Sequence, residues 1–384
     1  MKTLCVAVLV ALVGLAEEAP LPKAVWLTYA RNEPTHLMVN WATERPCASA
    51  VRYGSDAACG ARAVSSEQTA LHHVEVPLPA SGEFYYRLEV GGGVTEAGKF
   101  AGFPGDELRV AMVADWGFAG ADVSAILKDD VHLLATGGDH VAGLHGGGIV
   151  GDAAKTNLMP HLKLLSAYPA LFRHVPVMPV LGNHDREIRP RGKPETLKEP
   201  VYDVEATAYR ALFPLPDKGW CWQFQMPSFD VRFVGVDLNH VQDVGTFLQT
   251  CHDYREASEQ LAWYRGVMEG AGTRFTLTLN NEKSSVVRGL AKGEWGRLMR
   301  RGTLTATGFG YFAERAEDGG FPWFNTSLNG TGAVYKDALS RFVASENSYL
   351  LFRFRKGASA VRVELKRLAD GRVLDASEWP KRGP

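Results

Sequence analysis

The sequence predicts an α/β protein in which a small β-sandwich comes first and a larger domain with a buried parallel sheet follows. Three observations indicate this division. Short segments that alternate apolar and polar residues fill residues 22–104, a pattern typical of sandwich strands. From residue 107 onward, continuous apolar runs are separated by helical stretches, as expected for parallel strands buried on both faces. Turn-forming residues, Gly-Phe-Pro-Gly-Asp at 102–106, separate the two regions.

The overall composition describes an ordinary globular chain of one large or two unequal domains. Its 384 residues are 46% hydrophobic and 22% charged, and the formal net charge is −1. Proteins that bind nucleic acids usually carry a basic surface patch, and this sequence contains no basic run. We therefore expect no nucleic-acid partner.

The first 16 residues have the pattern of a secretory signal peptide. Lys2 precedes an apolar run of 13 residues at positions 4–16, and small residues near its end suit cleavage. A run of this length is too short to cross a bilayer, so we expect no membrane span. We predict a secreted or periplasmic protein; a buried N-terminal helix or strand is the alternative.

Four cysteines remain once a cleaved signal peptide has removed Cys5. Cys47 and Cys59 lie in the first predicted domain, and Cys221 and Cys251 lie in the second. An even count in an exported protein suggests disulfides. We predict a bond between Cys47 and Cys59 and treat Cys221–Cys251 as a second candidate. Four free thiols are the alternative, since spacing cannot determine connectivity.

Residues 22–104 fit a fibronectin-like β-sandwich. Gly and Pro separate the short strands that we expect at residues 24–29, 36–41, 50–53, 72–76 and 83–89. His72 and His73 are adjacent in one of these strands. Because neighbouring strand residues point to opposite faces, we do not expect this pair to bind a metal.

Three predicted strands of the second domain end in polar residues. The strand runs and the residues that follow them are 109–114 with Asp115, 131–138 with Asp139, and 175–182 with Asn183. Ligands of α/β proteins bind outside the carboxyl ends of parallel strands, so these three side chains are expected to converge. Two carboxylates and an amide oxygen suit a hard divalent cation.

The order Asp-x-Gly at 115–117, Gly-Asp-x-x at 138–141 and Gly-Asn-His-Asp at 182–185 resembles the calcineurin-like metallophosphoesterases. The preceding region resembles the small β-domain of purple acid phosphatases. This resemblance rests on Trp41, Val-Arg-Tyr-Gly at 51–54 and Phe-Tyr-Tyr-Arg at 84–87. The resemblance covers nearly the whole chain after the signal peptide. It implies a fibronectin III-like domain at 22–104, a four-layer αββα metallophosphoesterase domain at 107–366, and a C-terminal tail at 367–384.

The resemblance also implies roles for the site residues. Asp115 would bind one metal ion, Asp139 would bridge two ions, and Asn183 would bind the second. In the family, the His that follows the Asn lies beside the phosphate and is paired with an acid. His184 with Asp185 is therefore the predicted catalytic pair, able to hydrogen-bond an anion or donate a proton.

This chain departs from the family pattern at the other metal ligands. Ala142 stands where purple acid phosphatases carry a Tyr ligand, and the strand at 274–279 ends without the family's His. The family's Gly-His-x-His motif is replaced by Gly-Phe-Gly-Tyr, which puts Phe309 and Tyr311 at the two His positions. Loss of even an outer-shell partner costs roughly 10- to 100-fold in affinity or activity. With three His and one Tyr ligand missing, we expect no ordinary two-metal site.

The remaining oxygen ligands could still hold one ion, and Asn280, Asn281 or Glu282 could assist them. Such a site favours Mg²⁺, Mn²⁺ or Ca²⁺ over an iron–zinc pair; the absence of any bound metal is the alternative. His240 is a candidate replacement ligand. His140 is a poor one, because it should point away from Asp139.

Three functions are compatible with this pattern. We favour a secreted purple acid phosphatase-like metallophosphoesterase homologue, by family a phosphate monoester hydrolase, that is weakly active or inactive because its ligands are missing. Its partner would be a phosphate ester or another anionic small molecule. The alternatives are an active metal-dependent phosphomonoesterase with substitute oxygen ligands, and an exported binding or structural protein that uses the β-domain.

Overall fold

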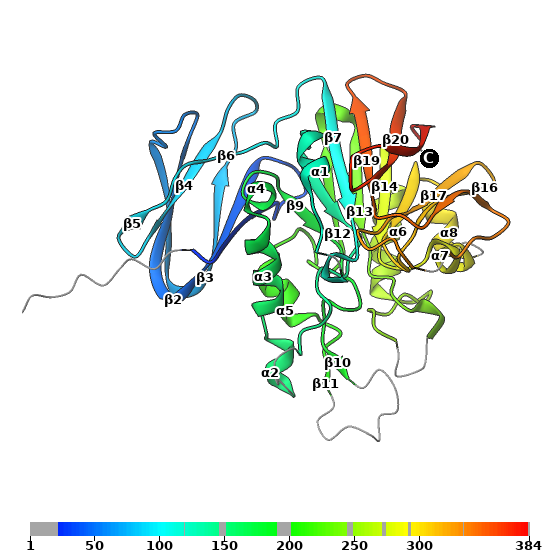
Figure 1. Cartoon of the computed structure of the whole chain (residues 1–384), viewed down its shortest axis with the longest axis horizontal. Coiled ribbons are helices and arrows are strands. Elements are labelled where there is room, and N and C mark those ends of the chain that lie inside the picture. The colour runs from blue at the N-terminus through cyan, green and yellow to red at the C-terminus, as the bar shows by residue number, and fades with distance from the viewer. Residues whose placement is uncertain are drawn as a thin grey trace, which may run out of the picture.

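The structure is a computed structural model of the chain in which a β-domain precedes a larger domain. It describes residues 22–118, 120–145, 151–189, 201–243, 249–270, 274–290, 293–332 and 334–382. The predicted signal peptide, at 1–16, lies outside these residues. Figure 1 shows the N-terminal β-domain beside a larger domain that is built around two sheets. None of the helices in the described ranges has the length and hydropathy needed to span a membrane.

The N-terminal domain is one connected antiparallel sheet. Its strands are β1 (Ala24–Thr28), β2 (His36–Gly54), β3 (Ala61–Pro77), β4 (Tyr85–Val90), β5 (Gly93–Val94) and β6 (Gly98–Lys99). The residues that we expected to form two strands, 36–41 and 50–53, belong to the single long strand β2. Its pairing with β3 is irregular between Ala42 and Ser49. Such irregularities bend a strand, so β2 can serve both halves of the domain.

Aromatic and imidazole rings hold the N-terminal domain together and join it to the larger domain. Trp41 stacks on His72 with ring centroids 4.7 Å apart. Across the domain boundary, Trp26 Nε1 donates to the Leu212 carbonyl at 3.0 Å, and His73 Nε2 donates to the Ala211 carbonyl at 2.9 Å. The two adjacent histidines thus serve packing and domain contact, on opposite faces of β3.

The first sheet of the larger domain has the order β21-β20-β19-β7-β8-β9. Its bounds are β7 (Glu107–Val113), β8 (Leu133–Thr136), β9 (Val177–Pro179), β19 (Ser348–Arg355), β20 (Ala360–Arg367) and β21 (Val373–Pro380). Strands β7, β8 and β9 are parallel neighbours. The predicted C-terminal tail at 367–384 contains β21, which pairs with β20, so the tail prediction is wrong over this strand.

The second sheet has the order β12-β13-β14-β15-β17-β16-β18. Its bounds are β12 (Trp222–Met226), β13 (Val231–Gly235), β14 (Phe275–Asn280), β15 (Leu304–Thr307), β16 (Ala313–Asp318), β17 (Phe321–Asn325) and β18 (Ser340–Ala344). Strands β13, β14, β15 and β17 run parallel. A short hairpin of β10 (Ile188–Arg189) and β11 (Val201–Tyr202) lies apart from both sheets.

Helices cover the sheets and leave one edge for the site. They are α1 (Ser124–Lys128), α2 (Asp152–Lys155), α3 (Met159–Ala167), α4 (Pro169–Phe172), α5 (Thr207–Leu212), α6 (Glu259–Glu269), α7 (Ser284–Leu290) and α8 (Glu294–Met299). Figure 1 shows α3 and α4 beside the N-terminal domain, whose β1 they contact, and α6 to α8 on the far side. Tyr264 of α6 and Trp295 of α8 pack in one buried cluster with Val234 of β13. Ser258 caps α6 by accepting from the Leu261 amide.

The cysteines of the described chain are all free thiols. Cys47, Cys59, Cys221 and Cys251 form no disulfide, so both predicted bonds are absent. Burial raises the pKa of the Cys221 and Cys251 thiols, which disfavours the reactive thiolate. The four cysteines after the predicted signal peptide are an even count, but pairing depends on distances in the folded chain.

Reduction is therefore expected to leave the stability unchanged. Dithiothreitol should shift Tm by no more than about 1 °C, whereas breaking a native disulfide typically removes about 2–5 kcal/mol. Thiol titration of the denatured, unreduced protein should find all four of these cysteines. Fewer reactive thiols together with a lower Tm after reduction would restore the disulfide prediction.

Candidate metal and ligand site

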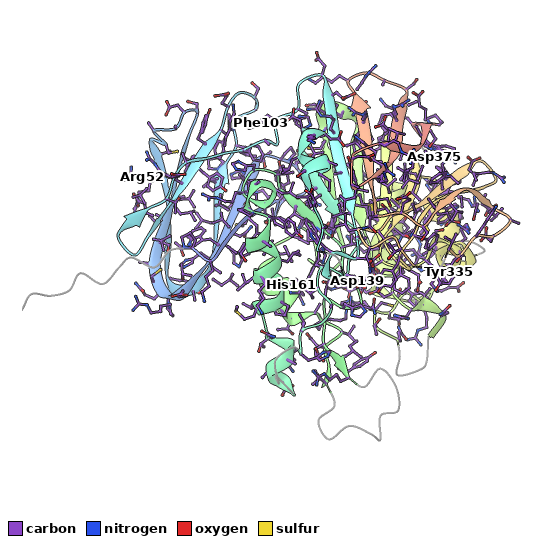
Figure 2. The ribbon with its side chains drawn as sticks, in the orientation of Figure 1. Arg52, Phe103, Asp139, His161, Tyr335 and Asp375 are labelled. Atoms are coloured by element: carbon purple, nitrogen blue, oxygen red, sulfur yellow. The ribbon has the colours of Figure 1, made fainter. Side chains whose placement is uncertain are left out.

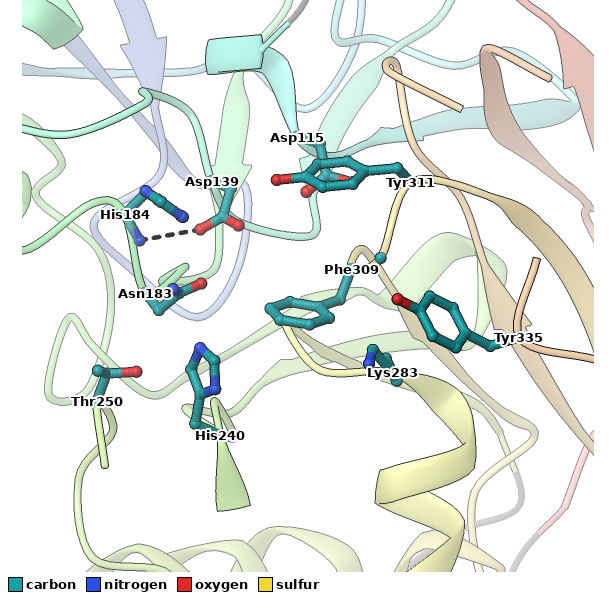
Figure 3. Close-up of a pocket in the computed structure, with 11 residues that line it drawn as sticks. Asp115, Asp139, Asn183, His184, His240, Thr250, Lys283, Phe309, Tyr311 and Tyr335 are labelled. Atoms are coloured by element: carbon teal, nitrogen blue, oxygen red, sulfur yellow. Dashed lines mark hydrogen bonds between the residues drawn. The ribbon is translucent and has the colours of Figure 1, made fainter. Parts of the chain in front are cut away.

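The three strand-end oxygen donors that the sequence singled out lie in one cleft. Asp115 follows β7, Asp139 follows β8 and Asn183 follows β9, and all three line a cleft of about 470 Å³. Figure 3 shows their side chains facing the same space, and Figure 2 shows Asp139 near the middle of the molecule, between His161 and Tyr335 in this view. They meet because parallel neighbours bring their carboxyl ends to the same sheet edge. Their role as metal ligands stays a prediction.

Both carboxylates are held on strained backbone. Asp115 has φ of 57° and Asp139 has φ of 55°, a left-handed conformation that costs a non-Gly residue about 1–3 kcal/mol. Two backbone hydrogen bonds join the ends of these strands. The Asp115 amide donates to the Gly138 carbonyl, and the Gly117 amide donates to the Asp139 carbonyl, both at 3.2 Å. Strain that persists under such bracing is typical of functional sites.

Two glycines allow the strand ends to approach closely. A Cβ on Gly182 would lie 2.1 Å from the Asp139 nitrogen, and a Cβ on Gly308 would lie 1.9 Å from the Ala114 Cβ. Real Cβ atoms do not come so close to other heavy atoms. Glycine is therefore required beside Asn183 and at the start of the 308–311 loop.

Asp115 is a buried carboxylate without a compensating partner. Its residue is 1% exposed, and within the described chain neither carboxylate oxygen has a hydrogen bond. Burial raises its pKa to about 7, and the negative charge of Asp185 adds to the rise. The Ser327 hydroxyl opposes the rise, although its geometry does not meet the limits of a hydrogen bond. A buried, unpaired anion is unfavourable, so a cation beside Asp115 would satisfy it.

The oxygen set fits one hard cation. Asp139 is buried and its Oδ1 accepts from the His184 amide at 3.0 Å, which orients the carboxylate beside Asn183 (Figure 3). Carboxylate and amide oxygens are the donors that Mg²⁺, Mn²⁺ and Ca²⁺ prefer. The unpaired oxygens of Asp115 complete a donor set of this kind.

Aromatic side chains stand at the two positions where the resemblance implied histidines. The Phe309 ring extends into the middle of the cleft (Figure 3) and meets the His240 ring edge-on, with centroids 5.6 Å apart. Its backbone amide donates to Asn325 Oδ1 at 3.3 Å, which holds the loop. Tyr311 extends its hydroxyl toward Asp115 and Asp139 (Figure 3). Burial, with the charges of these two aspartates, raises the pKa of Tyr311 to about 12, so the phenol stays protonated near neutral pH.

His184 and Asp185, the predicted catalytic pair, lie in different surroundings. His184 lines the cleft, and its Nδ1 donates to the Ala142 carbonyl at 2.9 Å. Asp185 is fully buried and is not among the described residues that line the cleft. Its carboxylate instead contacts the imidazole rings of His140 and His161. The position of His184 suits contact with a bound anion, whereas the position of Asp185 suits a structural role.

Asp185 is the centre of a buried hydrogen-bond network. Its carboxylate accepts from the amides of Gly182, Asp139 and His140 at 2.8–3.0 Å, from His140 Nδ1 at 2.8 Å and from His161 Nε2 at 3.3 Å. Burial alone would raise the pKa of Asp185, but the two histidines hold it below its ordinary value. The donor atoms of these three side chains lie within 4.8 Å of one another. A cation among them would face several inward-pointing N–H groups, so the cluster is better explained as a hydrogen-bond hub.

The polar residues after β14 do not line the cleft. Asn281 donates to the carbonyls of Gly137 at 2.6 Å and Gly308 at 2.5 Å, and its Oδ1 accepts from Asn239 at 3.0 Å. Glu282 accepts from the amides of Lys283 and Val241, and burial raises its pKa to about 7. These residues position the surrounding loops. Asn281 and Glu282 are therefore committed to loop contacts, whereas Asn280 is the last residue of β14 and both of its amide atoms are buried without a hydrogen bond in the described chain. Assistance of a cation by these residues stays a prediction.

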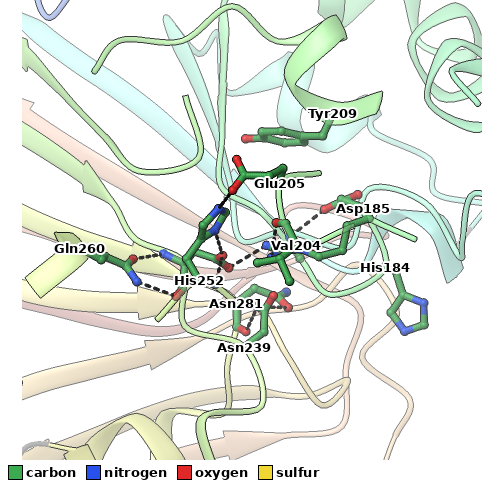
Figure 4. Close-up of polar contacts among 12 residues, drawn as sticks. His184, Asp185, Val204, Glu205, Tyr209, Asn239, His252, Gln260 and Asn281 are labelled. Carbon is green, nitrogen blue, oxygen red and sulfur yellow. Dashed lines mark hydrogen bonds and ion pairs between the residues drawn. The ribbon is translucent and has the colours of Figure 1, made fainter. Parts of the chain in front are cut away.

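A second buried network lies behind the cleft (Figure 4). Arg186 donates to Asp237 Oδ1 at 2.8 Å and to the Val204 carbonyl at 3.0 Å. His252 Nδ1 bonds Asp237 Oδ2 at 2.7 Å, and its ring stacks on Trp220 at 3.7 Å. His252, another loop histidine, is thereby committed to this network. His240 is the loop histidine that reaches the cleft.

Sequence reasoning missed several cleft residues. Thr250, Lys283 and Tyr335 line the cleft from loops or helix starts that carry no recognisable motif. Tyr311 was treated only as a lost His ligand, yet its hydroxyl lies beside the acidic centre. A motif comparison finds substitutions at known positions, but it cannot find donors that arrive from loops.

Solved structures share this fold. The purple acid phosphatase PPD1 from yellow lupin (Lupinus luteus) seeds superimposes with a TM-score of 0.68 at 14% identity, over 94% of this chain and 74% of that chain. The structure of PhoD superimposes with a TM-score of 0.69 at 11% identity, over 94% of this chain and 90% of that one. No model of a known protein family matches the sequence, and no curated protein matches it.

The fold class follows from these comparisons. Identities of this size establish the fold alone, and both comparisons cover almost the whole described chain. The chain therefore shares the fold of the purple acid phosphatase PPD1 and of PhoD, and the predicted mixed α/β architecture is confirmed.

Proposed function

We propose that this protein is a metallophosphoesterase homologue that binds one hard divalent cation and a phosphate ester in its cleft, with little or no hydrolysis. The observation that carries the proposal is the buried Asp115 carboxylate. It lacks a hydrogen-bond partner in the described chain, and it shares its cleft with Asp139 and Asn183. A bound cation would neutralise these carboxylates and attract a phosphate oxygen. His184 lines the same cleft, and because its Nδ1 already donates to the Ala142 carbonyl, it would donate to the anion from Nε2 in the doubly protonated ring.

The residues that occupy the cleft argue against catalysis by two metal ions. Hydrolysis by two metal ions requires a pair about 3.5–4 Å apart that clamps the phosphate. Here the Phe309 ring fills the middle of the cleft, and Asn281 is committed to the carbonyls of Gly137 and Gly308. Phosphate monoesters need accelerations of up to about 10²¹-fold, which a depleted centre is poorly equipped to supply.

The chemistry of the donors supports Mg²⁺, Mn²⁺ or Ca²⁺ as the cation. The three predicted ligands, and the nearby Tyr311 hydroxyl, all offer oxygen. Oxygen donors favour these hard ions over zinc or iron held by imidazole and thiolate. We also propose that residues 22–104 form a fibronectin III-like domain and that the protein is secreted or periplasmic. The signal-like pattern at residues 1–16 supports export.

Metal stoichiometry tests the proposal directly. Titration of the metal-free protein with Mn²⁺, followed by calorimetry, should give one ion per chain. Asp139→Asn should weaken binding by at least roughly 100-fold, because loss of a direct ligand exceeds the loss of an outer partner. Asp152→Asn is the matched control, since Asp152 is an exposed carboxylate on α2, and it should bind like the wild type.

Turnover of p-nitrophenyl phosphate separates the proposal from its alternatives. We expect the Mn²⁺-loaded wild type to hydrolyse it no faster than Asp139→Asn. Two bound ions with turnover that Asp139→Asn abolishes would instead identify an active phosphomonoesterase. No bound ion at all would leave the fold as a binding or structural scaffold.

A further inference from the structure

Beyond the oxygen ligands, the cleft contains a fixed aromatic wall. The Phe309 ring is held through its backbone bond to Asn325 and its edge contact with His240. Tyr335 continues the wall on the other side of Phe309 (Figure 3) and is 42% exposed. Lys283 Nζ lies 4.0 Å from the centroid of the Tyr335 ring and 5.9 Å from that of Phe309. The wall therefore combines flat apolar faces with one positive charge.

On the opposite side, the cleft contains a buried hydroxyl without a partner. Thr250 is 2% exposed, yet its Oγ1 has no hydrogen bond within the described chain. Figure 3 shows this hydroxyl pointing into the cleft. Buried polar groups in native proteins are nearly always paired, and an unpaired hydroxyl is unfavourable. A polar ligand group that reaches Thr250 would supply the missing hydrogen-bond partner of this hydroxyl.

The two features and the acidic centre belong to one cleft, so one molecule can meet all three. We propose that the ligand is an aryl phosphate whose ring carries a hydrogen-bonding group. Its phosphate lies at the cation centre, its ring lies against Phe309, and its ring substituent bonds Thr250 Oγ1. The phosphate end rests on the proposed function. An aliphatic ester would leave the aromatic wall uncovered.

Charge and packing both favour this ligand class. A phosphate monoester is negative, and Lys283 on the aromatic wall adds positive charge near the entrance of the cleft. Aromatic pairs gain affinity beyond their buried area. A ring packed against Phe309 would also displace water from the apolar surface of the aromatic wall.

Calorimetry on the full chain loaded with Mn²⁺ tests the proposal with four ligands: glycerol 2-phosphate, phenyl phosphate, and 3- and 4-hydroxyphenyl phosphate. Phenyl phosphate should bind about 10-fold more tightly than glycerol 2-phosphate because of the ring contact. One hydroxyphenyl isomer should gain about a further 5-fold from the Thr250 hydrogen bond. Two isomers are used because the position of the hydroxyl on the ring decides whether it reaches Thr250.

Variants assign each gain to its residue. Thr250→Val should bring the ratio between the hydroxyphenyl and phenyl ligands close to one, and Phe309→Leu should reduce the ratio between phenyl and glycerol phosphates. Thr156→Val is the control, since Thr156 is exposed at the end of α2, and it should alter neither ratio. Ratios between ligands cancel any general loss of folded protein.

The outcomes distinguish this proposal from the function on which it rests. If Mn²⁺ fails to bind, or no phosphate binds the loaded protein, the proposed function itself is wrong. If all four phosphates bind equally well and Thr250→Val leaves every ratio unchanged, the cation site stands and the aryl specificity is wrong.

Discussion

Asp115→Asn is expected to raise the free energy of unfolding of the metal-free protein at pH 8 by about 2–4 kcal/mol. The reason is the cost of a buried charge that has no partner. Burial raises the pKa of Asp115 to about 7 in the folded protein, against about 3.9 in an unfolded chain. Asn has nearly the same shape, carries no charge and tolerates the positive φ at this position.

The pH dependence gives this prediction a sign that can be checked. A carboxyl whose folded-state pKa is raised contributes stability that is fully present below about pH 4 and is lost as the pH rises through 7. The wild type should therefore lose stability between pH 4 and pH 8 relative to Asp115→Asn, and the gap between the two proteins should shrink toward pH 4. Urea unfolding in EDTA across this range measures both quantities.

Metal should reverse the order of stability. Mn²⁺ at 1,000 times Kd stabilises only a folded state that binds it, by about 4.1 kcal/mol, which covers the expected gap of about 2–4 kcal/mol. Asp115→Asn lacks a predicted ligand and should gain little from the ion. The wild type should then become the more stable protein. An Asp115→Asn variant that is less stable than the wild type in EDTA at pH 8 would show that the carboxylate already has a compensating partner.

The same substitution at Asp185 is expected to have the opposite effect. Asp185→Asn should lower the free energy of unfolding by about 3–5 kcal/mol at pH 7, as when one member of a buried charged network is removed. Asp185 is as buried as Asp115, but its oxygens accept three backbone amides and two imidazoles. The NH₂ group of an Asn side chain would face the backbone and imidazole N–H groups that now donate to Asp185, so donors would face donors.

Urea unfolding at pH 7 measures the loss, with Asp152→Asn as the control, because this exposed carboxylate pairs only with Lys155. Exposed pairs contribute about 0–1 kcal/mol, so the control should stay close to the wild type. A loss below about 1 kcal/mol in Asp185→Asn would contradict the network. It would also indicate that the strand ends at Asp139 and Gly182 are held by other contacts.

These two aspartates show how far local sequence could predict the site. Asp115, Asp139 and Asn183 were predictable because an apolar run followed by a polar residue is a local pattern. The position of parallel strand ends then places such residues at one edge. Their convergence needed no knowledge of the loops. The different surroundings of His184 and Asp185 could not be predicted, because a turn intervenes in which the Asp185 amide donates to the Gly182 carbonyl at 3.2 Å. The catalytic role of this pair stays a prediction.

Features that depend on contacts between distant segments were not predictable. The four cysteines suggested disulfides by their number, but a bond requires two Cβ atoms within about 4.5 Å, which only the fold decides. The predicted tail became β21 because β20 offered it an open edge. Thr250, Lys283 and Tyr335 entered the cleft from loops with no periodic pattern.

The sequence by itself determined the fold class and the oxygen side chains that follow the parallel strands, since both are written in short runs of residues. Only the tertiary structure decided which carboxylate carries an unpaired charge and which one is neutralised by donors. Charge compensation in a buried site depends on the N–H and imidazole groups that other segments bring within about 3 Å. For this reason Asp115 and Asp185, similar in the sequence, have opposite roles in the folded protein.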